Sequence, residues 1–255
     1  DSLASQGTVV IDNRPEILAK HFSSAGRSTE AIEQWQLAAA RAAANWSNVE
    51  ASSHLQLAVD ALSLLEEIEE RRLRELPLLL DLGNLQRAAY GSGSAQAFAT
   101  LQRAVALSRE DDDIETTLKI REAEFIAYFG SARLAECIPA AMELLRIGEL
   151  HSNAACLIAG HQCYGMQKFS VGDMEQAKNH LEKALGFGDT WPLDSVAVQF
   201  PTAAEAYLSW TLHMLGESDK AVEISDDSIA RSENGVAYSH ALSLANACYL
   251  HQFRG

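Results

Sequence analysis

A short pattern of small residues recurs along the chain and most limits how it can fold. In each copy a turn residue is followed five positions later by Ala, then after four by a large residue and after three by a second small one. Two clear copies are Gly26, Ala31, Trp35, Ala38 and Gly172, Ala177, Leu181, Ala184. Offsets of four and three share one helix face, and glycine readily takes the positive φ that ends a preceding helix. The pattern predicts helices that pack closely through small residues.

Weaker copies extend the pattern over most of the chain. They are Gly216, Ala221, Ser225, Ser228, then Ser92, Ala97, Leu101, Ala104, then Gly130, Ala135, Pro139, Met142, and a half copy Ala51, Leu55, Ala58 without a turn glycine. The chain therefore resembles a divergent tetratricopeptide array with a period longer than the usual 34 residues. The predicted fold class is all-α, an α-α superhelix of antiparallel helix hairpins.

Capping residues and helix breakers set the expected boundaries. We expect helices at 15–25, 29–46, 48–67, 69–90, 94–109, 114–129, 132–147, 152–171, 174–186, 202–215, 218–231 and 236–252. Residues 1–14 form an expected extended segment, and residues 15–255 a single helical repeat domain. We expect Gly165 to allow a close helix contact, and Pro77 and Pro139 to lie near helix starts or to kink their helices.

The net charge of the chain limits the classes of molecule that it can bind. The 255 residues include 20 Lys and Arg against 35 Asp and Glu, a net charge of -15, which argues against nucleic acid as a partner. No apolar stretch has the length of a membrane span, and the N-terminus lacks the pattern of a signal peptide. We expect a cytoplasmic piece of a longer chain, with its charge on outer turns such as the acidic run 110–113.

No sequence motif indicates a catalytic site or a metal site. The stretches 91–94 and 186–189 lack the Lys-Ser/Thr of a nucleotide loop and are expected to be helix-to-helix turns. The four cysteines form no CxxC pair, and buried structural thiols are the better interpretation. We therefore expect no enzyme activity, no cofactor and no metal.

The first helix of each hairpin in a tetratricopeptide array lines a concave groove. Applying that geometry here gives aromatic, Met, amide and carboxyl side chains, a composition typical of peptide-binding surfaces. The candidate binding residues are Gln86, Tyr90, Glu124, Tyr128, Gln162, Met166, Phe169, Trp210 and His213. Packing between hairpins is the alternative role for each of them.

A more specific resemblance lies near the N-terminus. The phrases PEILAKHF, AGRSTEAIEQW and NVEASSHL, within residues 14–65, are similar to the C-terminal tetratricopeptide region of bacterial signalling proteins that join an AAA- or STAND-type ATPase to an adenylate or guanylate cyclase. The resemblance implies a bacterial signalling role. Neither cyclase metal carboxylates nor a nucleotide loop is present, so those activities do not transfer to this chain.

Two functions follow as hypotheses. The first is a non-catalytic interaction or sensor module that holds a peptide or protein in its groove. The alternative is a small-molecule effector pocket near the 186–201 loop, formed by Trp191, Phe200, Trp210 and His213. A homo-oligomer is a further possibility, because a cut repeat array exposes an apolar end.

Overall fold

The computed structural model describes residues 14–63, 68–187, 200–233 and 237–254. These residues form twelve helices and no strands. None of the described helices is both long and apolar enough to cross a bilayer. The helices divide between two compact units. The first unit runs to Asp112 and includes Ile126–Ala132, and the second holds Asp113–Phe125 and continues from Arg133.

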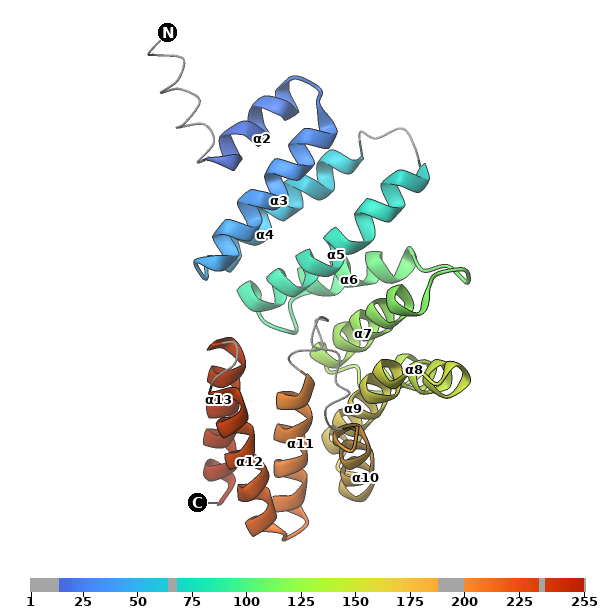
Figure 1. Cartoon of the computed structure of the whole chain (residues 1–255), viewed down its shortest axis with the longest axis vertical. Coiled ribbons are helices and arrows are strands. Elements are labelled where there is room, and N and C mark those ends of the chain that lie inside the picture. Colours follow the sequence, from blue (N-terminus) through green and yellow to red (C-terminus); the bar gives the residue numbers. More distant parts are fainter. Residues whose placement is uncertain (1–13, 64–67, 188–199, 234–236, 255) are drawn as a thin grey trace. The chain divides into compact units, whose positions relative to one another are not determined.

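The helices of the first unit pack against their neighbours in sequence (Figure 1). They are α2 (Pro15–Ser24), α3 (Ser28–Ala44), α4 (Asn48–Leu62), α5 (Ile68–Tyr90) and α6 (Ala95–Ala106). Helix α7 (Ile114–Gly130) gives its last residues to this unit and its earlier residues to the second. Pro77 lies inside α5, away from its start.

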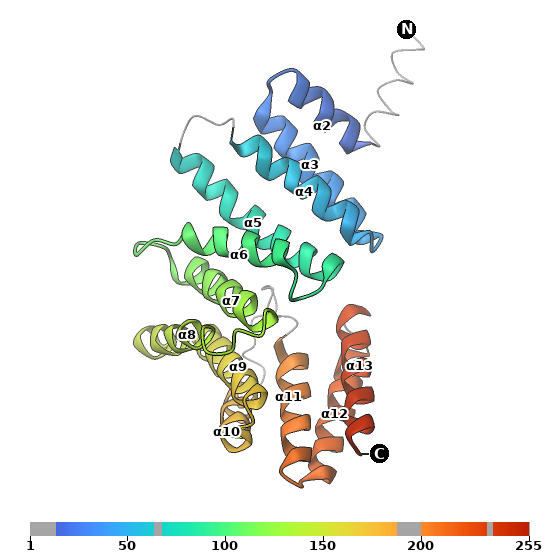
Figure 2. The same ribbon diagram turned by 180° about the vertical axis from the view of Figure 1, so that it is seen from behind.

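The second unit repeats the arrangement of helix hairpins. It contains α8 (Ile138–His151), α9 (Ala154–Ser170), α10 (Met174–Leu185), α11 (Phe200–Met214), α12 (Ser218–Ser232) and α13 (Ala237–Arg254). Helices α11, α12 and α13 lie side by side, as Figures 1 and 2 both show. First helices also contact one another across hairpins, α9 with α11 and α11 with α13. Most boundaries fall within a few residues of those predicted.

Small-residue stripes form the core, as the pattern predicted. The stripe residues at the offsets of zero, four and seven are buried in five copies: Ala31, Trp35, Ala38; Ala51, Leu55, Ala58; Ala97, Leu101, Ala104; Ala177, Leu181, Ala184; and Ala221, Ser225, Ser228. In the second unit Ala177, Leu181 and Ala221 of these stripes join one cluster with Ala204, Leu208 and Leu212 of α11 and Leu250 of α13. The stripes therefore hold consecutive hairpins together within each unit.

The predicted copy beginning at Ala135 is wrong by two residues. Ala135 and Pro139 are exposed, and so is Met142. The buried stripe at the same offsets is Cys137, Ala141, Leu144. Helix α8 accordingly begins at Ile138 rather than at 132, since proline lacks an N–H group and suits the first helical turn, where Pro139 lies.

The corrected register explains the turns between helices. Gly26, Gly172 and Gly216 stand five positions before their stripes and have positive φ, as expected. At the matching positions Trp46 has φ 59° and Ala132 has φ 57°. The left-handed turn is thus kept at two positions that lack glycine, whereas in the copy with Ala97 it lies one residue earlier, at Gly91.

Glycines inside the helices allow close packing. A Cβ atom built on Gly165 of α9 would lie 2.7 Å from Cγ of Leu181, a stripe residue of α10. The same relation joins Gly83 of α5 to Leu101 of α6, where a Cβ atom would overlap Cδ2 of the leucine. The close contact expected for Gly165 is confirmed.

We expect Ala132→Gly to stabilise the protein and Gly172→Ala to destabilise it, each by about 1 kcal/mol. A left-handed residue with a Cβ costs about 1–2 kcal/mol, partly offset by the entropy that glycine adds to the unfolded chain. Ala132 is exposed and the space around Gly172 is open, so packing contributes little to either change. Urea unfolding measures both, and changes of the same sign would contradict the interpretation.

Gly165→Ala is expected to lower the free energy of unfolding by about 1–2 kcal/mol. Overpacking a buried contact costs about 1–3 kcal/mol, which exceeds the roughly 1 kcal/mol that alanine gains over glycine in a helix. Leu181→Ala should relieve the clash, so the double variant loses less stability than the two single losses added together. A stabilised Gly165→Ala protein would show that α9 and α10 are not in close contact there.

Candidate functional site

Five aromatic side chains gather on the first helices of the second unit. Phe169 lies on α9, Tyr207 and Trp210 on α11, and Tyr249 and Phe253 on α13. The ring of Trp210 is central, with centroid distances of 5.0 Å to Tyr207, 6.0 Å to Phe169, 6.1 Å to Tyr249 and 6.4 Å to Phe253. We call these five residues the aromatic surface.

The aromatic surface is fixed on its inner side and open on its outer side. Phe169, Tyr207 and Trp210 pack against the buried cluster of this unit, and Trp210 donates a hydrogen bond from Nε1 to the carbonyl oxygen of Asn246 at 3.3 Å. Tyr249 and Phe253 remain 54% and 46% exposed. A rigid aromatic base with an exposed rim is typical of a surface that binds another molecule.

A polar pocket of about 570 Å³ occupies the first unit. Helices α4, α5 and α6 line it. The lining residues are uncharged: Ser52, Ser53, Gln56, Leu57, Gln86, Tyr90, Gln96, Ala99 and Thr100. Gln86 is 8% exposed, and its Oε1 has no hydrogen-bond partner in the described part of the chain. We call this cavity the polar pocket.

The structure brings six of the nine candidate residues together in pairs. Gln86 and Tyr90 line the polar pocket, and Phe169 and Trp210 belong to the aromatic surface. Gln162 is buried and its Nε2 lies 3.8 Å from Sδ of Met166. Burial of Gln86 and Gln162 fits the alternative role of packing between hairpins, and the binding function of all six residues stays a prediction.

The other three candidates have local partners. Glu124 accepts a hydrogen bond from Nη1 of Arg121 at 2.5 Å. The ring of Tyr128 contacts Phe98 edge to face with centroids 5.7 Å apart. Nδ1 of His213 lies 2.9 Å from the hydroxyl of Ser218 at the start of α12. Each contact is within one unit and fixes the side chain in place.

The binding residues predicted from the sequence do not include Tyr207, Tyr249 and Phe253, or the α4 and α6 residues of the polar pocket. Tyr249 and Phe253 are four apart on α13, which packs against α11 as the next first helix would. Treating α13 as a further first helix of the groove would have added Tyr249 and Phe253 to the predicted binding residues. The predicted effector pocket at 186–201 lies largely outside the described residues, including Trp191 and the side chain of Phe200.

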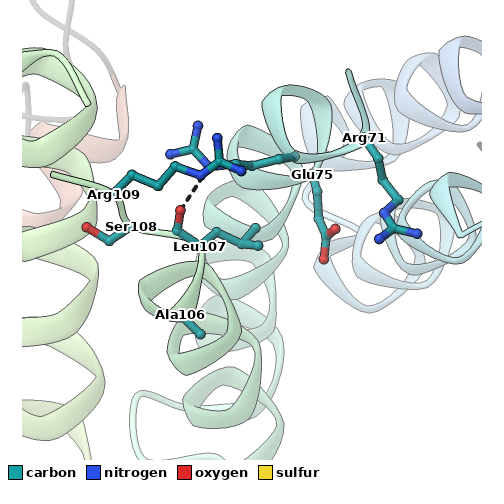
Figure 3. A pocket seen from close by; sticks show the side chains of 7 residues that line it. Arg71, Glu75, Ala106, Leu107, Ser108 and Arg109 are labelled. Atoms are coloured by element: carbon teal, nitrogen blue, oxygen red, sulfur yellow. Dashed lines mark hydrogen bonds between the residues drawn. The ribbon is translucent and has the colours of Figure 1, made fainter. Parts of the chain in front are cut away.

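A smaller cavity of about 200 Å³ in the first unit is lined by Arg71, Arg72 and Arg109, and the last two have partners within the protein (Figure 3). Nε of Arg72 donates to the carbonyl oxygen of Leu107 at 3.0 Å, and its Nη2 donates to Asp112. Arg109 pairs with Glu69 at 2.6 Å. The hydrogen bond that Arg72 donates to Asp112 raises the pKa of Arg72 above its usual range. Arg72 and Arg109 are therefore engaged in contacts that stabilise the fold.

The acidic run 110–113 is therefore only partly a solvated turn. Asp113 accepts a hydrogen bond from the backbone N–H of Thr116 at 2.7 Å and caps α7. The side chain of Asp112 is buried against Arg72, contrary to the solvated face expected. A buried arginine requires a paired carboxylate, and this requirement draws Asp112 inward.

Buried polar groups also lie under α7 and α9. Glu122 is buried and its Oε1 is unpaired in the part of the chain described, and desolvation raises its pKa to about 8. Burial likewise raises the pKa of Cys137 and Cys156 to about 11 and that of Cys163 well above its usual value. The three buried thiols match the prediction. Cys248 is exposed, because α13 buries the neighbouring stripe of Ser243, Ala247 and Leu250.

Two histidines meet between α9 and α10. Nδ1 of His161 lies 3.0 Å from Nδ1 of His180, and the ring of Tyr164 packs on His180. Burial, with His180 as a second cause, lowers the pKa of His161 to about 4, and burial also lowers the pKa of His180. Both imidazoles are therefore neutral near pH 7. Among the described residues no three His, Cys, Asp or Glu side chains form a group able to hold a metal.

These features define a helical repeat protein with a small-residue core and two uncharged surfaces. No family model matches the chain, and no curated protein matches it. The crystal structure of the apo form of RapI, a tetratricopeptide-like helical repeat protein, is similar in fold. The match has a TM-score of 0.61 and 14% sequence identity, and covers 95% of this chain and 70% of that one. The predicted fold class, an all-α tetratricopeptide-like superhelix, is confirmed.

Glu122 is expected to make stability depend on pH. Its pKa is about 8 when folded against a usual value of 4.5, so between these values only the unfolded chain releases the proton. The free energy of unfolding should then fall as pH rises from about 4.5 to about 8, by up to about 1.4 kcal/mol per pH unit.

Glu122→Gln removes this titration. The free energy of unfolding of the variant, minus that of the parent chain, should therefore become more positive from pH 5 to pH 8. Urea unfolding at several pH values measures the difference. Glu149→Gln, at an exposed position of α8, is the matched control. Parallel pH profiles for the Glu122→Gln variant and the parent chain would mean that Glu122 is ionised inside the fold.

Proposed function

We propose that this chain is a non-catalytic interaction module that binds a peptide or protein segment on the aromatic surface of its second unit. The observation that carries the proposal is the ring cluster around Trp210, whose outer members Tyr249 and Phe253 are about half exposed. Exposed aromatic side chains on a rigid base are the groups that contribute most to protein–protein binding.

The arrangement suits a segment with apolar anchors. The rings come from three successive first helices, α9, α11 and α13, so the surface extends across several helices. Trp210 is held by its hydrogen bond to Asn246 and by contacts with both neighbouring helices. Little side-chain entropy is then lost at Trp210 when a partner binds, which favours affinity.

The proposed cellular role and the proposed flanking domains rest on the sequence resemblance described above. We propose that the module acts in a cytoplasmic bacterial signalling protein that also contains an ATPase and a cyclase domain. The small-molecule pocket near residues 186–201 stays an alternative prediction. The homo-oligomeric state also stays a prediction, which light scattering of the purified chain will check.

A peptide-display selection against the full chain tests the proposal. We expect enriched peptides with aromatic or aliphatic anchors, and we expect Tyr249→Ala combined with Phe253→Ala to weaken their binding at least tenfold, because the exposed rings are hot-spot groups. Fluorescence anisotropy of labelled peptides measures the affinity.

Leu150→Ala is the matched control, since Leu150 is an exposed apolar residue on α8 of the same unit, outside the aromatic surface. It should leave peptide affinity unchanged. Equal binding to the parent chain and to the double variant, or no enrichment of any peptide, would refute the proposal.

A further inference from the structure

The polar pocket of the first unit differs in chemistry from the aromatic surface. Its lining combines hydroxyl and amide groups with the partly exposed ring of Tyr90. Its volume of about 570 Å³ lies within the range typical of small-molecule sites. None of the residues that line it carries a charge.

Several hydrogen-bonding atoms of the pocket can act only as acceptors. The hydroxyls of Ser52 and Ser53 both donate to the carbonyl oxygen of Val49 at 2.9 Å, which uses their only protons. Gln56 donates from Nε2 to Asp60 at 2.8 Å, and its Oε1 accepts. Oε1 of Gln86 also lacks a partner among the described residues, but protein atoms enclose it, so it does not face a ligand. A ligand that fits this side of the pocket must present hydrogen-bond donors.

The other polar groups of the lining can donate. Thr100 has a hydroxyl proton, and Gln96 has an amide NH₂ group. A ligand must therefore donate on one side of the pocket and accept on the other. A hydroxyl group does both at a single atom, so a ligand carrying several hydroxyls satisfies the lining in more than one orientation.

Charged ligands suit the pocket poorly. Phosphates and carboxylates only accept hydrogen bonds, so they would face the acceptor oxygens of Ser52, Ser53 and Gln56, with no cation in the lining to compensate. An ammonium group would lose water with no carboxylate in the lining to pair with it. The lining thus selects for uncharged ligands.

The apolar part of the lining favours a ring-shaped ligand. Tyr90 supplies a flat ring that is 46% exposed, and Leu57 and Ala99 add aliphatic contacts. Sugars and cyclic polyols carry a C–H face that packs on such a ring while their hydroxyls point to polar groups at the edge.

We propose that the polar pocket between α4, α5 and α6 binds an uncharged, hydroxyl-rich ring compound, a sugar or a cyclic polyol. Ser52, Ser53 and Gln56 accept hydrogen bonds from its hydroxyls, and Tyr90 packs on its C–H face. The site is separate from the peptide surface proposed above and does not depend on it.

Titration of the full chain with a defined panel of probes tests the proposal. The neutral members are glucose, galactose, sucrose, trehalose and myo-inositol, and the charged members are glucose 6-phosphate and glucosamine. Saturation-transfer NMR and calorimetry measure binding up to about 10 mM, since weak polar sites reach millimolar Kd values. At least one neutral probe should bind, and more tightly than either charged probe.

One double variant and one control locate the binding. Ser53→Ala with Tyr90→Ala changes two exposed positions that the fold does not require. The double variant is expected to weaken binding of the neutral probe at least tenfold. Gln36→Leu, at an exposed glutamine of α3 outside the pocket, should have no effect.

The outcomes separate this proposal from the proposed function. Retained sugar binding in the Tyr249→Ala, Phe253→Ala double variant, together with loss in Ser53→Ala, Tyr90→Ala, supports the pocket whether or not peptides bind. Absence of binding by every neutral probe, tighter binding of a charged probe, or undiminished binding in the Ser53→Ala, Tyr90→Ala variant would overturn it.

Discussion

Close approach of helix backbones is the constraint on which the rest of this structure depends. Leu181 can reach the α9 backbone only because position 165 has no side chain, and Leu101 reaches α5 at Gly83 in the same way. Each hairpin uses its small-residue face for this packing. Long side chains on the neighbouring faces are then left for other purposes, and in the second unit those on α11 and α13 form the aromatic surface.

Charge plays a secondary but specific part. The net charge of -15 is carried largely by exposed carboxylates, many of which pair with arginine or lysine one helical turn away. Such exposed pairs contribute little stability. The exceptions are buried carboxylates. Asp112 pairs with Arg72, Glu75 with Arg103 and Glu205 with Arg231, whereas Oε1 of Glu122 has no hydrogen-bond partner among the described residues. Both proposed binding regions are built from uncharged side chains, so the acidity of the chain is not what selects a ligand there.

The sequence was most informative where packing demands a particular residue size. Ala and Gly at fixed offsets revealed the hairpins, because few other residues fit where two helices touch. Cys137 was not predicted as a stripe residue, because the pattern requires alanine at this position. Cysteine is similar to alanine in size but differs in residue type. Trp46 and Ala132 gave no sign of their left-handed turns, because a positive φ is readable from sequence mainly when glycine supplies it.

Binding surfaces were harder to predict than the core. Phe169 and Trp210 followed from the geometry of first helices, whereas Tyr249 and Phe253 required knowing that α13 continues the series. The polar pocket joins residues of α4, α5 and α6, and only Gln86 and Tyr90 of α5 followed from that geometry. Ser52 and Ser53 resemble ordinary helix-surface residues until the packing of three helices places them in one lining.

The distribution of thiols has a practical consequence. Three of the four cysteines are buried with pKa values far above neutrality, and Cys248 alone is exposed. It precedes Tyr249 on α13, so the native chain offers a single site for attaching a fluorophore or spin label without any engineered cysteine. A reporter at this position would stand beside the aromatic rings and register occupancy of that face directly.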